Sequence, residues 1–118
     1  MAFLKAQGSY GARLEDPNDS REFEDALTFR SPSVQRVAIT PDLIGVRGRW
    51  FEPLDVADPD AVVLYLHGGG YAYSARAHDT LIANVALATG LRVYAVDYRL
   101  APEHRYPAQL EDARAAYA

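Results

Sequence analysis

Residues 61–71 read Ala-Val-Val-Leu-Tyr-Leu-His-Gly-Gly-Gly-Tyr, and this stretch decides the fold. The first six residues form an unbroken apolar run, which predicts a parallel β-strand covered by helices on both faces. Three glycines, Gly68, Gly69 and Gly70, follow one residue later. Because glycine has no Cβ, the backbone there can turn sharply and expose consecutive N–H groups. The stretch therefore predicts a buried strand that ends in a loop of hydrogen-bond donors.

The residues after this loop predict a helix, a second strand and a second helix. Residues 77–89 carry apolar side chains at helical spacing, and Gly90 stands where a helix commonly ends. Residues 91–96 predict the next parallel strand, and Pro107 predicts the first position of the last helix. Such an order predicts a right-handed crossover in a parallel sheet. The side chains of the last helix that we expect to face the core are Leu110, Ala113 and Tyr117.

The part of the chain before residue 61 has two different patterns. Residues 1–33 are rich in charge and turn formers, with a short helical spacing around Phe23. Residues 34–51 contain two β-rich runs joined by a turn, which predict an antiparallel strand pair near the edge of the sheet. The sequence thus predicts an α/β fold: an antiparallel strand pair, followed by parallel strands with flanking helices.

Two phosphate-binding interpretations of the glycine loop fail on spacing. A dinucleotide fingerprint needs a third glycine three residues after its second, and that position holds Tyr73. A P-loop needs Gly-Lys-Ser or Gly-Lys-Thr, which is absent from the sequence. Two interpretations stay open: donors for the oxyanion of an acyl-transfer reaction, and a glycine-rich turn needed only for tight packing.

A second motif lies at residues 97–104, Asp-Tyr-Arg-Leu-Ala-Pro-Glu-His. Together with the glycine motif about thirty residues earlier, it resembles the hormone-sensitive-lipase family of α/β-hydrolases. The resemblance covers residues 34–118. It implies that residues 1–33 are the amino-terminal cap segment and that residues 34–118 are an incomplete core, the amino-terminal half of the fold, which stops before the nucleophile elbow.

The resemblance also implies roles for individual residues. It makes the complete protein a serine carboxylesterase without metal or organic cofactor. Its oxyanion donors would be Gly69 and Gly70, supported by the turn at Gly68. In this family the motif histidine, here His67, orients the loop and is not the catalytic base. Tyr71 and Tyr73 would line the pocket or pack against the cap, and both interpretations stay open.

The acidic residues of the second motif do not suit the catalytic triad. In α/β-hydrolases the acid follows the nucleophile along the chain, whereas Asp97 and Glu103 would precede it. We expect Asp97 and Arg99 to hold the neighbouring loop, with Glu103 as the partner of Arg99.

A nucleophile is missing from the sequence. An elbow needs Gly-x-Ser-x-Gly, and none of the five serines has that spacing. We therefore expect the 118 residues alone to be inactive, the ester substrate to be a small molecule, and the missing carboxyl-terminal half, or a self-associated copy, to cover the open side of residues 93–96. The alternatives are a non-catalytic small-molecule receptor on the same fold and an inactive truncated product. The serines are Ser9, Ser20, Ser31, Ser33 and Ser74.

Composition excludes several other classes of protein. The net charge is −4 without a cluster of Lys and Arg, which argues against a nucleic-acid partner. Because the chain has no cysteine, it has neither a disulfide framework nor a thiolate metal site. The sequence shows neither a signal peptide nor a membrane span, so we expect a cytoplasmic protein.

Overall fold

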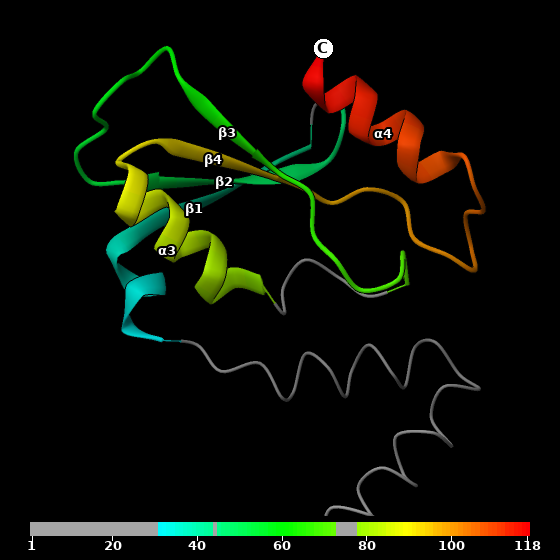
Figure 1. Ribbon diagram of the computed structural model, residues 1–118, viewed down its shortest axis with the longest axis horizontal. Coiled ribbons are helices and arrows are strands. Elements are labelled where there is room, and N and C mark those ends of the chain that lie inside the picture. Colours follow the sequence, from blue (N-terminus) through cyan, green and yellow to red (C-terminus); the bar gives the residue numbers. More distant parts are fainter. Residues whose placement is uncertain (1–30, 44, 73–77) are drawn as a thin grey trace, which may run out of the picture.

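The computed structural model describes residues 31–43, 45–72 and 78–118. They form a four-stranded mixed sheet with one helix on each face (Figure 1). The predicted helical segment around Phe23 and the predicted pocket residue Tyr73 lie outside this part of the chain. In chain order the elements are the 3-10 helix η1 (Pro32–Arg36), β1 (Val37–Asp42), β2 (Gly48–Pro53), β3 (Val62–Tyr65), α3 (Asp79–Thr89), β4 (Arg92–Val96) and α4 (Ala108–Tyr117).

The strand order in the sheet is β1-β2-β4-β3. β1 and β2 are antiparallel, and β4 lies antiparallel to β2 on its other side. β3 and β4 are parallel, with Val63 opposite Val93, and α3 connects them. The predicted α/β fold, with an antiparallel pair and parallel strands, is confirmed.

Our expectation about the open side of the sheet was wrong. We expected residues 93–96 to lack a neighbouring strand, but β4 lies between β2 and β3, and Val93 and Val96 are fully buried. Within the described residues the edge strands are β1 and β3, and Val62 of β3 is 45% exposed. Both strands are apolar runs, and an apolar run does not reveal the lateral order of strands in a sheet.

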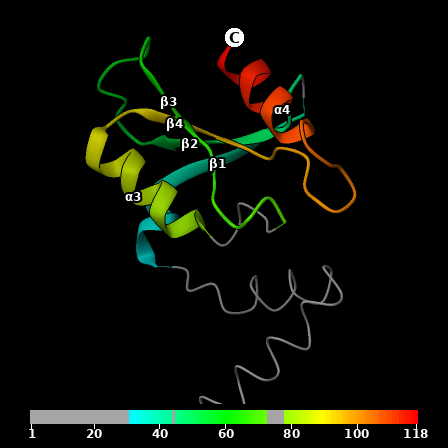
Figure 2. The ribbon, with the colours of Figure 1, turned by 45° about the vertical axis from the view of Figure 1, so that its right-hand side comes forward.

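The two faces of the sheet carry alternate residues of each strand, as the pleat requires. On one face, Phe51, Val93 and Ala95 pack against the apolar stripe of α3, which includes Ile82 and Ala86. Figure 2 shows α3 and α4 on opposite sides of the sheet. On the α4 side of the sheet, Trp50, Leu64, Tyr94 and Val96 belong to one apolar cluster with Ala116 of α4.

Helix α3 ends as predicted. Gly90 has φ 68°, in the left-handed region that glycine adopts without a Cβ clash, and its N–H donates to the carbonyl of Ala86 at 2.9 Å.

Helix α4 begins one residue later than predicted and presents a different face. Pro107 is its cap residue. Leu110 is 40% and Tyr117 84% exposed, while Ala108 and Gln109 are buried. Alanine is the commonest residue of α4, so helical spacing alone allowed more than one inward face.

No helix in the described ranges is both long and apolar enough to cross a membrane.

Candidate active site

The glycine loop follows β3 directly and lies beside the segment that follows β4. Parallel strands bring their carboxyl ends to the same edge of a sheet, so these two segments meet there. The N–H of Ala101 donates to the carbonyl of Tyr71 at 2.8 Å, which ties the second motif to the first. The sheet thus brings together the two motifs that lie about thirty residues apart in the sequence.

The backbone of the loop is left-handed at three successive residues. Gly69 has φ 116°, Gly70 has φ 59° and Tyr71 has φ 62°. The N–H of Ala72 donates to the carbonyl of Gly69 at 3.1 Å, which closes a turn. A Cβ on Gly70 would contact nothing, so a larger residue there is opposed by backbone strain and not by lack of space.

His67 is held beneath the loop by Tyr98. The two rings stack with centroids 4.2 Å apart and planes 1° from parallel, and the Tyr98 hydroxyl donates to the carbonyl of His67. His67 Nδ1 lies 2.8 Å from the carbonyl oxygen of Gly68, which only accepts, so Nδ1 carries the proton. Burial, and secondly the neighbouring His78, lower the pKa of His67, while the bond to Gly68 opposes them. The imidazole is therefore a neutral group that contacts the loop.

Tyr98 is a site residue that sequence reasoning did not single out. It is only 7% exposed, and burial raises the pKa of its phenol, so the hydroxyl keeps the proton that it donates. A signal was present, because Tyr94, Val96 and Tyr98 alternate along one face of the chain and join the same cluster.

Arg99 binds helix α4 through Asp112 and Glu111, whereas Glu103 was the partner expected from the sequence. The Arg99 side chain reaches Asp112 from Nε at 3.0 Å and from Nη2 at 2.9 Å, and Glu111 from Nη2 at 3.1 Å. The backbone N–H of Arg99 donates to the same Asp112 carboxylate at 2.8 Å. These bonds hold the pKa of Asp112 below its usual value. The carboxylates reach Arg99 from the next helix, which sequence proximity did not reveal.

The side chain of Asp97, also expected to hold this loop, is exposed, and its backbone N–H donates to the carbonyl of Arg47 at 2.9 Å.

A cavity of about 620 Å³ lies between the glycine loop and the segment from Tyr98 to Ala113. Tyr71, one of the two predicted pocket residues, lines it, as does Gly70. The other lining residues are Leu66, His67, Tyr98, Ala101, Arg105, Tyr106, Gln109, Leu110 and Ala113. Gly70 of the loop therefore borders a space large enough for a small organic molecule.

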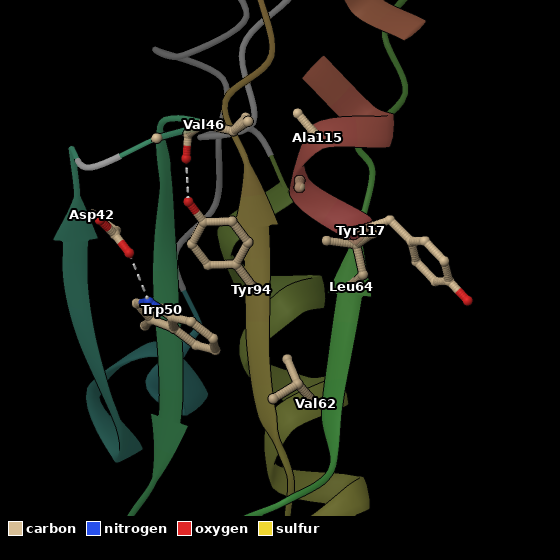
Figure 3. A pocket seen from close by; sticks show the side chains of 10 residues that line it. Asp42, Val46, Trp50, Val62, Leu64, Tyr94, Ala115 and Tyr117 are labelled. Atoms are coloured by element: carbon tan, nitrogen blue, oxygen red, sulfur yellow. Dashed lines mark hydrogen bonds between the residues drawn. The ribbon is translucent and has the colours of Figure 1, made fainter. Parts of the chain in front are cut away.

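A second cavity, of about 490 Å³, lies on the α4 side of the sheet (Figure 3). Its walls include Val62, Leu64 and the Trp50 and Tyr94 rings, whose centroids are 4.7 Å apart. The polar groups of these rings are bonded to other lining residues: Trp50 Nε1 donates to Asp42 at 3.3 Å, and the Tyr94 hydroxyl donates to the carbonyl of Val46. None of the glycine-loop residues lines this cavity, so the first one is the better candidate site.

Further contacts hold the far side of the loop. His78 directly precedes α3. Its Nδ1 forms a hydrogen bond with the Tyr65 hydroxyl at 2.8 Å. The next residue, Asp79, is 1% exposed and forms a bidentate ion pair with Arg49 of β2. No pattern in the sequence indicated this pair, because its members are thirty residues apart and in different elements.

Comparison with known proteins gives a consistent result. A family model described as the alpha/beta hydrolase fold matches residues 63–118. The chain is 50% identical over 64 residues to an ethyl acetate hydrolase of Pseudomonas putida, covering 53% of this chain and 20% of that protein. It is 45% identical over 106 residues to the carboxylesterase NlhH of Mycobacterium tuberculosis, covering 89% of this chain and 32% of that protein.

Solved structures agree with these relatives. An esterase from the bacterial hormone-sensitive lipase family superposes with a TM-score of 0.78 at 38% identity, over 86% of this chain and 34% of that one. A hormone-sensitive lipase from a metagenome library superposes with a TM-score of 0.77 at 35% identity over the same shares of the two chains. The chain thus spans about a third or less of the length of these relatives.

Proposed function

Because this chain has the α/β-hydrolase fold and is related to the esterases of the hormone-sensitive-lipase family, we propose that it supplies the oxyanion-hole loop of a carboxylic ester hydrolase. The observation that carries the proposal is the left-handed backbone at Gly69 and Gly70, of which Gly70 lines the 620 Å³ cavity at the carboxyl end of a parallel strand. Backbone donors at such a place suit the negative oxygen that develops on an ester substrate.

In the proposed reaction, a nucleophile attacks the ester carbonyl and the carbonyl oxygen becomes negative. The N–H groups of Gly69 and Gly70 bind this oxygen, and their bonds strengthen as the charge develops. Gly68 provides the turn that brings both donors to one side. Since the donors are fixed before the reaction, they need little reorganisation in the transition state.

His67 orients the loop in this mechanism and is not the base. Its Nδ1 proton is directed at the Gly68 carbonyl, and its ring is stacked on Tyr98. Arg99, through Asp112, holds the neighbouring segment and with it one wall of the cavity.

The serine nucleophile, the triad acid and the base lie outside the 118 residues in this proposal. The relatives are about three times longer than this chain, so their remaining length has room for these groups. We propose that the remaining part of such a hydrolase, or a second copy of this chain, covers the β3 edge of the described sheet. The substrate is a small carboxylic ester, the class named for the Pseudomonas putida ethyl acetate hydrolase. The cytoplasmic location stays a prediction.

A joined polypeptide tests the proposal. Residues 1–118 would replace the matching segment of the Mycobacterium tuberculosis carboxylesterase, which supplies the rest of the fold. Hydrolysis of p-nitrophenyl acetate and ethyl acetate would be measured for the joined polypeptide and for the 118-residue chain. We expect turnover by the first and none above a matched blank by the second.

Two results would contradict the proposal. One is a joined polypeptide that unfolds cooperatively and hydrolyses neither ester. The other is turnover by the isolated chain that survives purification and disappears when one of its five serines is replaced.

A further inference from the structure

A buried ion pair joins β2 to the first turn of α3. Arg49 Nη2 lies 2.8 Å from Asp79 Oδ1, and Nη1 lies 3.1 Å from Oδ2, so the guanidinium and the carboxylate meet as two parallel hydrogen bonds. The Asp79 side chain is 1% and that of Arg49 15% exposed. The guanidinium also lies over the Phe51 ring, 5.2 Å from its centroid. The position and tilt of the carboxylate are therefore fixed by a rigid partner.

This pair holds a helix start that has no side-chain cap of its own. The cap residue, His78, makes no capping bond to the helix backbone. The first turn is bonded to other parts of the chain instead. Asp79 binds Arg49 of β2, and the Thr80 hydroxyl accepts from the N–H of Ser31, the residue before η1, at 3.2 Å. Long-range bonds from Asp79 and Thr80 thus help to hold the first turn of α3 in place.

The position of the first turn of α3 also determines where His78 lies beside the glycine loop. His78 Nδ1 is 2.8 Å from the Tyr65 hydroxyl, and its ring centroid is 6.2 Å from that of His67. Gly68 leaves room beside this ring, because a Cβ at that position would lie 4.0 Å from His78 Cε1. His67 in turn contacts the glycine loop, since its Nδ1 donates to the carbonyl of Gly68 at 2.8 Å. A shift of Asp79 that moves His78 would therefore reach the glycine loop through His67.

We propose that the Arg49–Asp79 pair is a positioning pair for the oxyanion loop: it fixes His78 beside His67, whose Nδ1 binds the Gly68 carbonyl, and so sets the direction of the N–H groups that follow. The inference rests on the function proposed above. Stability alone does not account for such a pair, because apolar residues of similar size often replace buried ion pairs without loss. A fixed direction for the first turn is what the bidentate geometry adds.

Kinetics of the joined polypeptide separate positioning from stability. The variants are Asp79→Asn, Arg49→Lys, which keeps the charge and loses the planar fork, and the double variant Arg49→Met/Asp79→Leu. The control is Glu52→Gln, which removes a partly exposed 3.9 Å contact to Arg92 on the same sheet. For every variant kcat, KM and the midpoint of thermal unfolding would be measured.

We expect kcat to fall about 10- to 100-fold in all three pair variants, since a small misplacement of a preorganised group has an effect of this size, with little change in KM. The double variant should keep the unfolding midpoint while its kcat stays low, and Glu52→Gln should match the unsubstituted protein. A double variant with unchanged kcat overturns the inference. An unsubstituted joined polypeptide that folds and shows no turnover overturns the proposed function itself.

A second measurement needs no turnover. The chain has eight glycines, so the amide spectrum of the 118-residue chain labelled with ¹⁵N-glycine is simple. Asp79→Asn should shift the signals of Gly68, Gly69 and Gly70 and leave those of Gly45 and Gly90 in place. Unchanged loop signals would overturn the inference whatever the kinetics show.

Discussion

At the scale of single residues, two kinds of group shape the candidate site. Glycines give the loop a backbone that side chains oppose, and the stacked rings of His67 and Tyr98 hold its first residue. The Tyr98 hydroxyl adds a buried hydrogen bond to the carbonyl of His67. Removing such a donor leaves a carbonyl without its partner, which makes the contribution measurable.

The first prediction concerns this hydroxyl. Tyr98→Phe keeps the ring stack and removes the donor, so the free energy of unfolding should fall by about 1 to 3 kcal/mol. Urea denaturation would measure it. Tyr71→Phe is the control, because that side chain is 63% exposed. An unchanged free energy in Tyr98→Phe would show that the bond does not stabilise the loop.

The second prediction concerns the oxyanion donors in the joined polypeptide. Gly69 and Gly70 have φ values of 116° and 59°, which a valine side chain opposes. Gly69→Val and Gly70→Val would therefore force the backbone out of its present geometry. Loss of one oxyanion donor typically lowers kcat about 100- to 1,000-fold, because the bond matures only in the transition state. Steady-state kinetics would show the change in kcat with a smaller change in KM. An unchanged kcat in both variants would remove these residues from the mechanism.

The third prediction follows from the lowered pKa of His67, which burial causes. The unfolded chain binds a proton on this residue near pH 6.5, while the folded chain does not until a lower pH. The free energy of unfolding should therefore decrease as the pH falls from about 7.5 through 6.5, and the decrease should be smaller in His67→Gln. Urea denaturation at about pH 7.5 and about pH 5.5 tests it, with the exposed His104→Gln as control. The same pH dependence in wild type and His67→Gln would show that burial of this imidazole is not the cause.

At the scale of secondary-structure elements, Arg99 joins α4 to the segment after β4 and lowers the pKa of Asp112. A depressed carboxyl pKa stabilises the fold above the ordinary value of about 3.8 and loses that effect as the pH falls through the folded pKa. The fourth prediction is that Asp112→Asn is less stable than wild type at about pH 5 and that the difference narrows at about pH 3. Chemical denaturation at both values measures it. A difference that persists unchanged at the lower pH would mean that charge is not its origin.

Local signals in the sequence predicted most elements. Gly90 ends α3 because the left-handed residue that closes a helix is commonly glycine, and the apolar runs at β3 and β4 became strands. The lateral order was not predictable in the same way, since it depends on how chain segments cross over and not on the content of each strand. The same reason explains why β3, and not β4, is an edge strand of the described sheet.

The residues of the candidate site that are contiguous in the sequence could be singled out from it, whereas the contacts between residues far apart in the sequence could not. The glycine loop and the Asp97–Arg99 motif are contiguous, so their residue types were visible in the sequence. Three partnerships were not: Tyr98 with His67, Arg99 with Asp112, and Arg49 with Asp79. Each joins residues in different elements, and only the folded chain brings them together.

At the scale of the whole molecule, the described sheet has two edges of different character. β1 contains Pro41, which cannot donate a backbone hydrogen bond and so hinders pairing with another strand. β3 has no proline, and Val62 and nearby Leu66 are 45% and 49% exposed. Val62 and Leu64 also line the second cavity, so apolar surface continues from this edge onto the sheet face (Figure 3).

The last prediction is that the 118-residue chain pairs through the β3 edge when it is alone. An exposed apolar edge is a template for another strand, and a charged side chain on it opposes pairing. Light scattering coupled to size-exclusion chromatography should therefore give a mass above 13.0 kDa for the wild type and a mass nearer 13.0 kDa for Val62→Lys. Thr40→Lys places the same charge on β1, where Thr40 is exposed, and should leave the association unchanged. A wild-type species of 13.0 kDa that unfolds cooperatively and binds no apolar dye would show that the β3 edge needs no partner.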